Sequence, residues 1–254
     1  ADDMGLGKTL QALALLLDSH GGQPEGLPSL VVCPTSVLHT WREQAARFAP
    51  SLRLHLHQGA RRGTPPANGE VDLILTSYAL LRQDAEHWQR RRFRHLILDE
   101  AQALKNPDSQ LAAVARSVQA RHPLALSGTP LENNLLELWS LFEILMPGFF
   151  GSRRRFRRRW VDPVHKHEDA ATLARLRRRL RPFLLRRLKR EVADELPPKQ
   201  EQVLRCRMGR EQRQLYERVR ETYRSSVLGA VDARGIGAAH LHILEALTRL
   251  RQAC

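Results

Sequence analysis

Short apolar runs alternate with helical patterns over residues 1–150 of the chain. The runs rich in aliphatic and β-branched residues predict strands at 29–33, 52–56, 71–76, 95–99 and 123–127. Amphipathic or strongly apolar helical patterns cover 10–17, 37–48 and 135–146. Strands that alternate with helices predict an α/β fold with a parallel, doubly wound sheet. Such a sheet binds ligands at the carboxyl ends of its strands, so we expect the functional residues there.

The pattern changes after residue 150. Residues 151–190 read as basic helices, 201–208 as one strand, and 210–228 and 238–253 as helices. The last helix carries leucines at 241, 244, 247 and 250 on one face, and we expect further chain to cover that face. This reading divides the chain into an α/β lobe at 1–150, a basic helical protrusion with a linker at 151–199, and a strand with helices at 200–254.

The positive charge of the chain is concentrated in one segment. Residues 153–190 hold sixteen Lys or Arg and three Asp or Glu, an excess of +13 within a net charge of +14. A general bias toward arginine would explain the choice of Arg over Lys, but not the scarcity of acids in this segment. The distribution predicts a surface that faces a polyanion. A solvated helical face is the alternative.

The composition excludes several classes of protein. No apolar run reaches the roughly 18 residues that span a bilayer, and no secretory signal opens the chain. The three cysteines are isolated, and none of the eleven histidines has companion ligands at metal spacing. We expect a reduced, intracellular protein with no membrane partner.

A phosphate-binding loop opens the sequence. Gly5 and Gly7 let backbone N–H groups close on phosphate oxygens, and the helix beginning near Leu10 adds the positive end of its dipole. Lys8 would reach the β- and γ-phosphates, and the Thr9 hydroxyl would bind Mg²⁺. These residues predict a site for a nucleoside triphosphate with its magnesium ion.

The loop departs from the general pattern in one place. Asp2 stands where that pattern has glycine. A phosphate loop also normally follows a strand, and none precedes Ala1 in this sequence. We therefore expect the chain to be a piece of a longer protein whose first strand lies outside it.

A second motif supplies acidic groups. The apolar run 96–98 ends in Asp99 and Glu100. Asp99 could hold Mg²⁺ and Glu100 could orient the attacking water, which are the positioning and charge neutralisation that phosphoryl transfer needs. Alone, the pair could simply begin a helix with favourable acids. Together with Lys8 it indicates ATP hydrolysis.

The order of the motifs resembles that of the SWI/SNF-like ATPases of bacterial type, which are helicase-related DNA translocases of superfamily two. The matching segments are 2–9 (motif I), 32–38 with Trp41 (Ia), 76–78 (Ib), 99–102 with 105–106 (II), 126–130 with 132–134 (III), 181–189 with 196–199 (between the lobes) and 247–252 (entering the second lobe). The resemblance covers nearly the whole chain. It implies a RecA-like ATP-binding lobe that uses Mg²⁺ and has double-stranded DNA as its partner.

The resemblance also implies roles for individual residues. Gln102 would report the nucleotide state, and Ser127 and Thr129 would couple that state to DNA contact. The residues that would contact the DNA backbone are Thr35, Ser36, Thr76, Ser77, Asn106, Arg186 and Arg187. Hydroxyl, amide and guanidinium groups suit phosphates, although helix capping and turn formation are alternatives for the small polar residues.

Family members close ATP between two RecA-like lobes, and the second lobe supplies arginine fingers. We therefore expect this chain to hold half of an active site and not to turn over ATP alone. A module that binds DNA without turnover and a small-molecule kinase are the competing classes. A kinase would leave the motifs at 99–102 and 127–130 and the basic segment unexplained. The expected location is the nucleoid-associated cytoplasm of a bacterium or the nucleus of a eukaryote.

Overall fold

The chain forms two compact units, Ala1–Leu196 and Pro197–Cys254. The computed structural model describes residues 2–20, 26–128, 135–192, 201–204 and 206–254.

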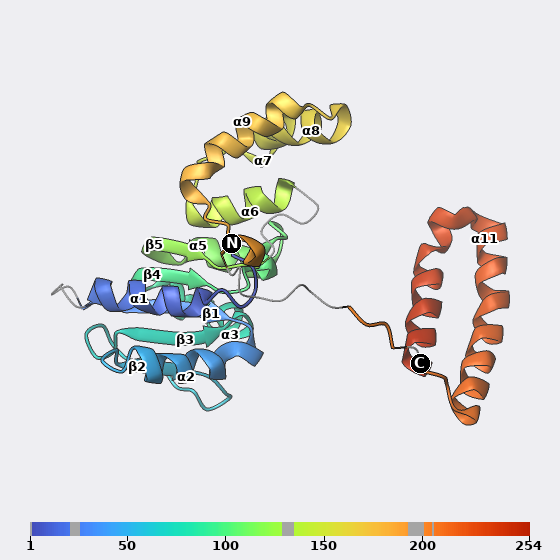
Figure 1. The fold of residues 1–254 in the computed structure, drawn as a ribbon, viewed down its shortest axis with the longest axis horizontal. Coiled ribbons are helices and arrows are strands. Elements are labelled where there is room, and N and C mark those ends of the chain that lie inside the picture. The colour runs from blue at the N-terminus through green and yellow to red at the C-terminus, as the bar shows by residue number, and fades with distance from the viewer. Residues whose placement is uncertain (1, 21–25, 129–134, 193–200, 205) are drawn as a thin grey trace. The chain divides into compact units, whose positions relative to one another are not determined.

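A five-stranded parallel sheet forms the centre of the first unit (Figure 1). Its strands lie in the order β2 (Leu54–His57), β3 (Leu73–Ser77), β1 (Ser29–Cys33), β4 (Arg92–Leu98) and β5 (Gln119–Ala125). All residues of β1 and β3 are buried, as expected for strands covered on both faces. The predicted doubly wound sheet is confirmed.

Helices cover both faces of this sheet. Helices α1 (Lys8–His20) and α2 (Leu38–Phe48) pack their apolar sides on one face. The helices on the other face are α3 (Tyr78–Gln83), α4 (Ala85–Gln89), α5 (Gln110–Ser117) and α6 (Leu135–Leu145). The sequence pattern did not predict α3, α4 and α5, which are only five to eight residues long.

Two strands begin earlier than the apolar pattern predicts. β4 starts at Arg92 and β5 at Gln119, where these two residues pair with each other. The first residue of each strand is exposed and polar. Backbone pairing extends the strands where no apolar signal marks them.

The basic segment forms a helical hairpin on α6. Helix α7 (Arg153–Phe156), the π-helical turn Arg157–Val161 and α8 (Asp162–His167) make one arm, and α9 (Ala170–Leu180) makes the other. A third apolar core, which includes Phe150, Phe156, Trp160 and Leu176, joins the hairpin to Leu138 and Phe142 of α6. The aromatic rings of this segment therefore serve packing. The short elements η4 (Arg181–Phe183) and α10 (Lys189–Val192) follow.

The second unit is helical in its described part. Helix α11 (Arg210–Ala253) is interrupted at Gly235, whose φ of 74° and ψ of 164° break it into two helical arms. Gln212 Nε2 donates to the carbonyl oxygens of Ala253 and Cys254, and the Tyr223 hydroxyl contacts Glu245. The two predicted helices are confirmed, and each is longer than predicted.

The strand predicted at 201–208 is wrong for the residues that the structure describes there, 201–204 and 206–208. A strand is stable only when a partner completes its backbone hydrogen bonds, and the described partners in this unit are helical. Val203 and Leu204 are both more than 80% exposed, so these apolar side chains are not buried as those of a core strand would be.

Among the described residues, no helix combines the length and the apolar character needed to cross a bilayer.

Candidate nucleotide-binding site

The opening loop has the backbone geometry of a phosphate cradle. Gly5 and Gly7 have φ angles of 84° and 70°, a left-handed conformation that other residues adopt only at a cost. Gln11 N donates to Gly7 O at 3.0 Å. The first turn of α1, which contains Thr9 and Leu10, therefore lies beside the loop, and the first N–H groups of a helix have no intrahelical partner.

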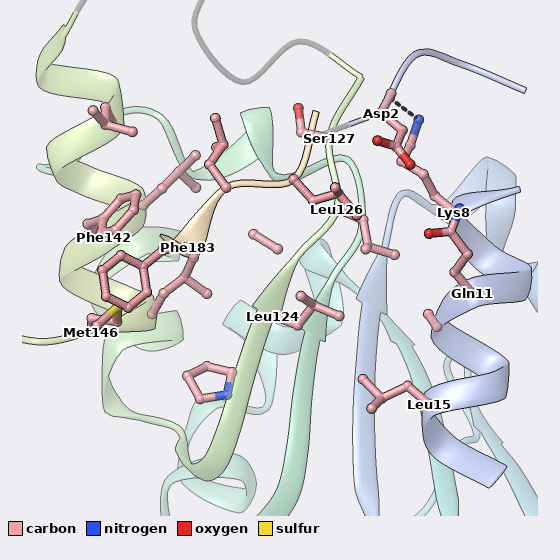
Figure 2. Close-up of a pocket in the computed structure, with 18 residues that line it drawn as sticks. Asp2, Lys8, Gln11, Leu15, Leu124, Leu126, Ser127, Phe142, Met146 and Phe183 are labelled. Atoms are coloured by element: carbon pink, nitrogen blue, oxygen red, sulfur yellow. Dashed lines mark hydrogen bonds between the residues drawn. The ribbon is translucent and has the colours of Figure 1, made fainter. Parts of the chain in front are cut away.

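Lys8 is the first residue of α1, and its ammonium group lies inside the loop. Nζ donates to the carbonyl oxygens of Asp2 at 2.8 Å and Asp3 at 3.1 Å. Figure 2 shows the contact between Lys8 and Asp2 at the start of α1. The loop thus surrounds a positive charge where a phosphate group would bind.

Asp99 follows β4 and is held by groups from three parts of the chain. The indole N–H of Trp41 donates to Oδ2 at 2.8 Å, and Glu100 N donates to Oδ1 at 3.0 Å. The Tyr78 hydroxyl donates to the Asp99 carbonyl oxygen at 2.7 Å. Each carboxylate oxygen therefore accepts one of these hydrogen bonds and keeps a further lone pair for another ligand.

The charge of Asp99 depends on this environment. Burial raises the pKa of Asp99, whereas the Trp41 and Glu100 hydrogen bonds and the charge of Lys8 oppose the rise. A cation beside the carboxylate would favour its ionised form further. Burial also raises the pKa of Cys33 to about 12, so this thiol stays protonated at neutral pH.

Glu100 occupies a left-handed backbone conformation, with φ of 50° and ψ of 53°. This conformation costs on the order of 1 kcal/mol or more for a residue with a side chain, and such residues concentrate at functional sites. Its Oε2 accepts from Gln102 Nε2 at 2.7 Å, and Gln102 Oε1 accepts from the Ser127 hydroxyl at 3.2 Å. The predicted catalytic and coupling residues are therefore connected by hydrogen bonds.

Gly128, which follows Ser127, lies against the phosphate loop. A Cβ atom placed on Gly128 would come within 3.3 Å of Met4 Cγ and 3.9 Å of Lys8 Nζ. The Met4 side chain therefore lies so close to Gly128 that a larger residue would have to displace it. Thr129, the second predicted coupling residue, lies outside the described residues.

An apolar cavity of about 340 Å³ adjoins the phosphate loop (Figure 2). Asp2, Lys8 and Gln11 lie at its polar side. Its apolar walls include Leu15, Leu124, Leu126, Phe142, Met146 and Phe183. Residues from both ends of the first unit therefore meet beside the loop.

Three of the five small polar residues predicted to contact DNA are exposed. Thr35 and Ser36 form part of the short 3₁₀ helix η1 (Thr35–Val37) that follows β1. Asn106 is exposed in the turn after the 3₁₀ helix η2 (Ala101–Leu104), where its Oδ1 accepts from Asp108 N at 3.0 Å. The hydroxyls of Thr35 and Ser36 and the amide nitrogen of Asn106 are accessible to a ligand.

Thr76 and Ser77 do not fit the same prediction. Thr76 is fully buried, and its hydroxyl donates to the carbonyl oxygen of His57 at 3.3 Å. Ser77 is 3% exposed and caps α3, because its hydroxyl accepts from Leu80 N. Both hydroxyls lie within the fold, so the structure does not support them as DNA contacts.

Arg186 and Arg187 have different surroundings although they are adjacent. Arg186 is exposed. Arg187 forms an ion pair with Asp2, a carboxylate whose side chain is 4% exposed, and lowers the pKa of that carboxyl group. The prediction that Arg187 contacts DNA is therefore not supported, because its guanidinium already binds a buried carboxylate.

Three residues that position the site were not assigned these roles from the sequence. They are Trp41 and Tyr78, which hold Asp99, and Asp2, which binds Arg187. A buried indole or phenol needs a hydrogen-bond partner, so an apolar helix face that contains Trp41 was a usable signal. Nothing in the local sequence indicates which acceptor it reaches.

Comparison with known proteins identifies the family. The SNF2-related domain matches residues 1–254. The chain belongs to this family. It is similar to the TATA-binding protein-associated factor MOT1 of Saccharomyces cerevisiae, at 34% identity over all of this chain and 15% of that protein. It is also similar to the putative ATP-dependent helicase/translocase YwqA of Bacillus subtilis, at 39% identity over all of this chain and 28% of that protein.

Solved structures give the same result. The SWI2/SNF2 ATPase core of Sulfolobus solfataricus in complex with double-stranded DNA matches with a TM-score of 0.70 and 34% identity, over all of this chain and 53% of that one. The chain thus has the fold of an SNF2 ATPase core and is an SNF2-family ATPase domain. It spans 15% and 28% of the length of the two curated relatives and 53% of the solved core.

Proposed function

We propose that this chain binds ATP and Mg²⁺ as one half of the active site of a DNA-dependent motor. The motor would couple ATP hydrolysis to translocation on double-stranded DNA or to remodelling of protein–DNA complexes. The observation that carries this proposal is the hydrogen-bonded connection from Glu100 through Gln102 to Ser127, beside the Lys8 ammonium.

The residues divide the work of phosphoryl transfer. Gly5, Gly7 and the first turn of α1, including Leu10, would bind phosphate oxygens through backbone N–H groups, and Lys8 would neutralise the β- and γ-phosphates. Glu100 would orient the attacking water. Gln102 would transmit the nucleotide state to Ser127.

The donor set around Asp99 fits a magnesium ion. No group of three or more His, Cys, Asp or Glu side chains in the described part of the chain could hold a metal. The ion would therefore depend on Asp99, the Thr9 hydroxyl and phosphate oxygens, which is how Mg²⁺ is commonly bound with nucleotides. When bound, Mg²⁺ would neutralise the charge that develops on the phosphates.

Double-stranded DNA is the proposed partner, because the matched solved core was bound to it. Thr35, Ser36, Asn106 and Arg186 are exposed and could contact its backbone. A second RecA-like lobe of the same protein would supply the arginine fingers and close the site. The proposed location is the nucleoid of a bacterium or the nucleus of a eukaryote.

Phosphate release by the intact gene product, measured with and without duplex DNA, tests the proposal. Duplex DNA should stimulate the release, and Lys8→Ala should lower it at least about 100-fold, because the γ-phosphate loses its positioned charge. Arg42→Ala, which removes an exposed charge from α2, is the control. Phosphate transfer to a small molecule that is independent of DNA would contradict the proposal and favour a kinase.

A further inference from the structure

The segment that follows the basic hairpin returns to the phosphate loop. The Phe183 ring packs edge-on against Phe149 at 5.1 Å and against Phe142 at 6.5 Å. Phe183, Leu184 and Leu185 then line the cavity beside the loop (Figure 2). These apolar contacts fix the path of the chain immediately before Arg187.

Arg187 donates hydrogen bonds to the Asp2 carboxylate from both its backbone and its side chain. Its backbone N donates to Asp2 Oδ1 at 2.9 Å, and its Nε donates to Oδ2 at 3.1 Å. The guanidinium also donates to Gln11 Oε1 at 2.9 Å, which adds a contact to α1. Nη2 of the guanidinium also donates to Asp2 Oδ2, so both carboxylate oxygens of Asp2 are held by Arg187. Several donors from one residue fix geometry as well as charge.

The neighbouring residues extend the contact. Asp3 N donates to the Arg187 carbonyl oxygen at 3.1 Å, and Lys189 N donates to Asp3 Oδ2 at 3.1 Å. A Cβ atom on Gly5 would lie 3.2 Å from Lys189 Nζ. One short segment therefore contacts Asp2, Asp3 and Gly5 of the phosphate loop.

Asp2 and Asp3, which the segment at 187–189 holds, also position the Lys8 ammonium group. The carbonyl oxygens that accept from Lys8 Nζ belong to Asp2 and Asp3. A glycine-containing loop has many accessible conformations, and ordering it has an entropic cost. Contacts that order the loop before the triphosphate arrives lower the cost of binding.

We propose that Arg187 is a positioning residue for nucleotide binding, which acts on the phosphate loop through Asp2. The proposal rests on the proposed function and adds that the segment after the basic hairpin sets the affinity of the loop for the triphosphate. It also gives a physical reason for the departure at position 2. Glycine there would have no carboxylate for Arg187 to hold.

The test measures the dissociation constant of a fluorescent ATP analogue with Mg²⁺, on the intact gene product and without DNA. Arg187→Ala should raise this constant about tenfold, and Arg187→Lys should raise it by a smaller factor, since lysine keeps the charge but lacks the planar guanidinium with its two donors to Oδ2. Arg42→Ala is the charge-matched control and should leave it unchanged. Melting temperatures of all variants are recorded alongside.

A double-mutant cycle identifies the route of the effect. If Arg187 acts through Asp2, Arg187→Ala should have little additional effect in an Asp2→Asn background. Equal effects of Arg187→Ala in both backgrounds would overturn the proposal. So would dissociation constants for Arg187→Ala and Arg187→Lys that both match the control.

If Arg187→Ala does not fold, the Arg187→Lys and Asp2→Asn variants test the proposal instead. In that case, an unchanged affinity of both variants for the ATP analogue would overturn the proposal. A wild-type protein that binds no nucleotide at all would instead contradict the proposed function, so the two failures can be distinguished.

Discussion

The carboxyl edge of the sheet and the basic hairpin use charge in opposite ways. At the sheet edge, Asp99 is 7% exposed and is held by Trp41, Tyr78 and the Glu100 backbone. On the hairpin, Arg154, Arg155 and Arg158 are exposed. The buried side of the hairpin packs through its aromatic rings. A few charges are fixed in one place, and many are left in solvent.

The difference reflects two kinds of task. A reacting phosphate requires charge at a fixed point, because catalysis depends on preorganised geometry. A DNA backbone presents charge along its whole length, so a mobile, solvated cation can bind it without a fixed geometry. The hairpin is not uniform in this respect, since Arg153 is paired with Asp108 at 2.7 Å and Arg157 lies near Asp162 at 3.7 Å.

The largest effect is expected where charge is most fixed. Glu100→Gln should lower DNA-stimulated ATP hydrolysis about 100-fold or more, because the water loses its orienting carboxylate. ATP binding should persist, since Lys8 and Asp99 are unchanged. Phosphate-release rates and nucleotide affinity check this, with Glu86→Gln on the exposed side of α4 as the control. A normal rate for the variant would remove Glu100 from the mechanism.

On the hairpin, the solvated arginines should control DNA affinity. Replacing Arg154, Arg155 and Arg158 with Gln should flatten the slope of log affinity against log salt by about one to three units, through lost counterion release. The loss should be similar for unrelated sequences. Titrations of labelled duplex at three salt concentrations measure it.

The matched comparison is the double change Arg153→Gln with Arg157→Gln, which removes the two arginines that lie near acids. It should flatten the slope less and lower the melting temperature more. Equal slopes for all variants would assign the hairpin to structure rather than to DNA.

A smaller effect is expected when Asp99 loses the hydrogen bond from Trp41. Trp41→Phe keeps the ring in the core but removes the N–H that donates to Oδ2. The pKa of Asp99 should rise further, and Mg²⁺ affinity in the presence of nucleotide should fall about tenfold, as for other groups that orient a metal ligand. A magnesium titration of ATP hydrolysis checks this, and an unchanged midpoint would show that the hydrogen bond is dispensable.

The smallest effect concerns Asp84, a carboxylate outside the site that is paired with Arg62. Hydrogen bonds from Arg62, and more weakly from His57, lower the pKa of Asp84 to about 2 against the opposing effect of burial. A depressed pKa stabilises the fold above the ordinary value of 3.8, and this stabilisation is lost as pH falls toward 2. Asp84→Asn should lower the melting temperature by about 3 °C at pH 6.

The variant should also flatten the dependence of the melting temperature on pH between 4 and 2. Thermal unfolding across this range tests the prediction. A parallel curve for the variant would show that Asp84 is not the group responsible.

The sequence by itself determined the parallel sheet with its flanking helices α1, α2 and α6, and the linear motifs, whereas the short helices α3, α4 and α5 and the spatial order of the strands came only from the structure. Lys8, Asp99 and Glu100 follow from local rules, since a phosphate loop and a strand that ends in acids are each contiguous in sequence. The hairpin followed from composition and helical period. Strand ends were less well predicted, because pairing extends β4 and β5 beyond their apolar residues.

Only the tertiary structure decided which polar groups are available. Thr76 and Ser77 carry the residue types of a DNA contact, yet one is buried against His57 and the other caps a helix. Arg187 carries the residue type of a phosphate contact but binds Asp2, 185 positions earlier in the chain. Burial and pairing between distant residues depend on how the elements pack, and no local pattern encodes that packing.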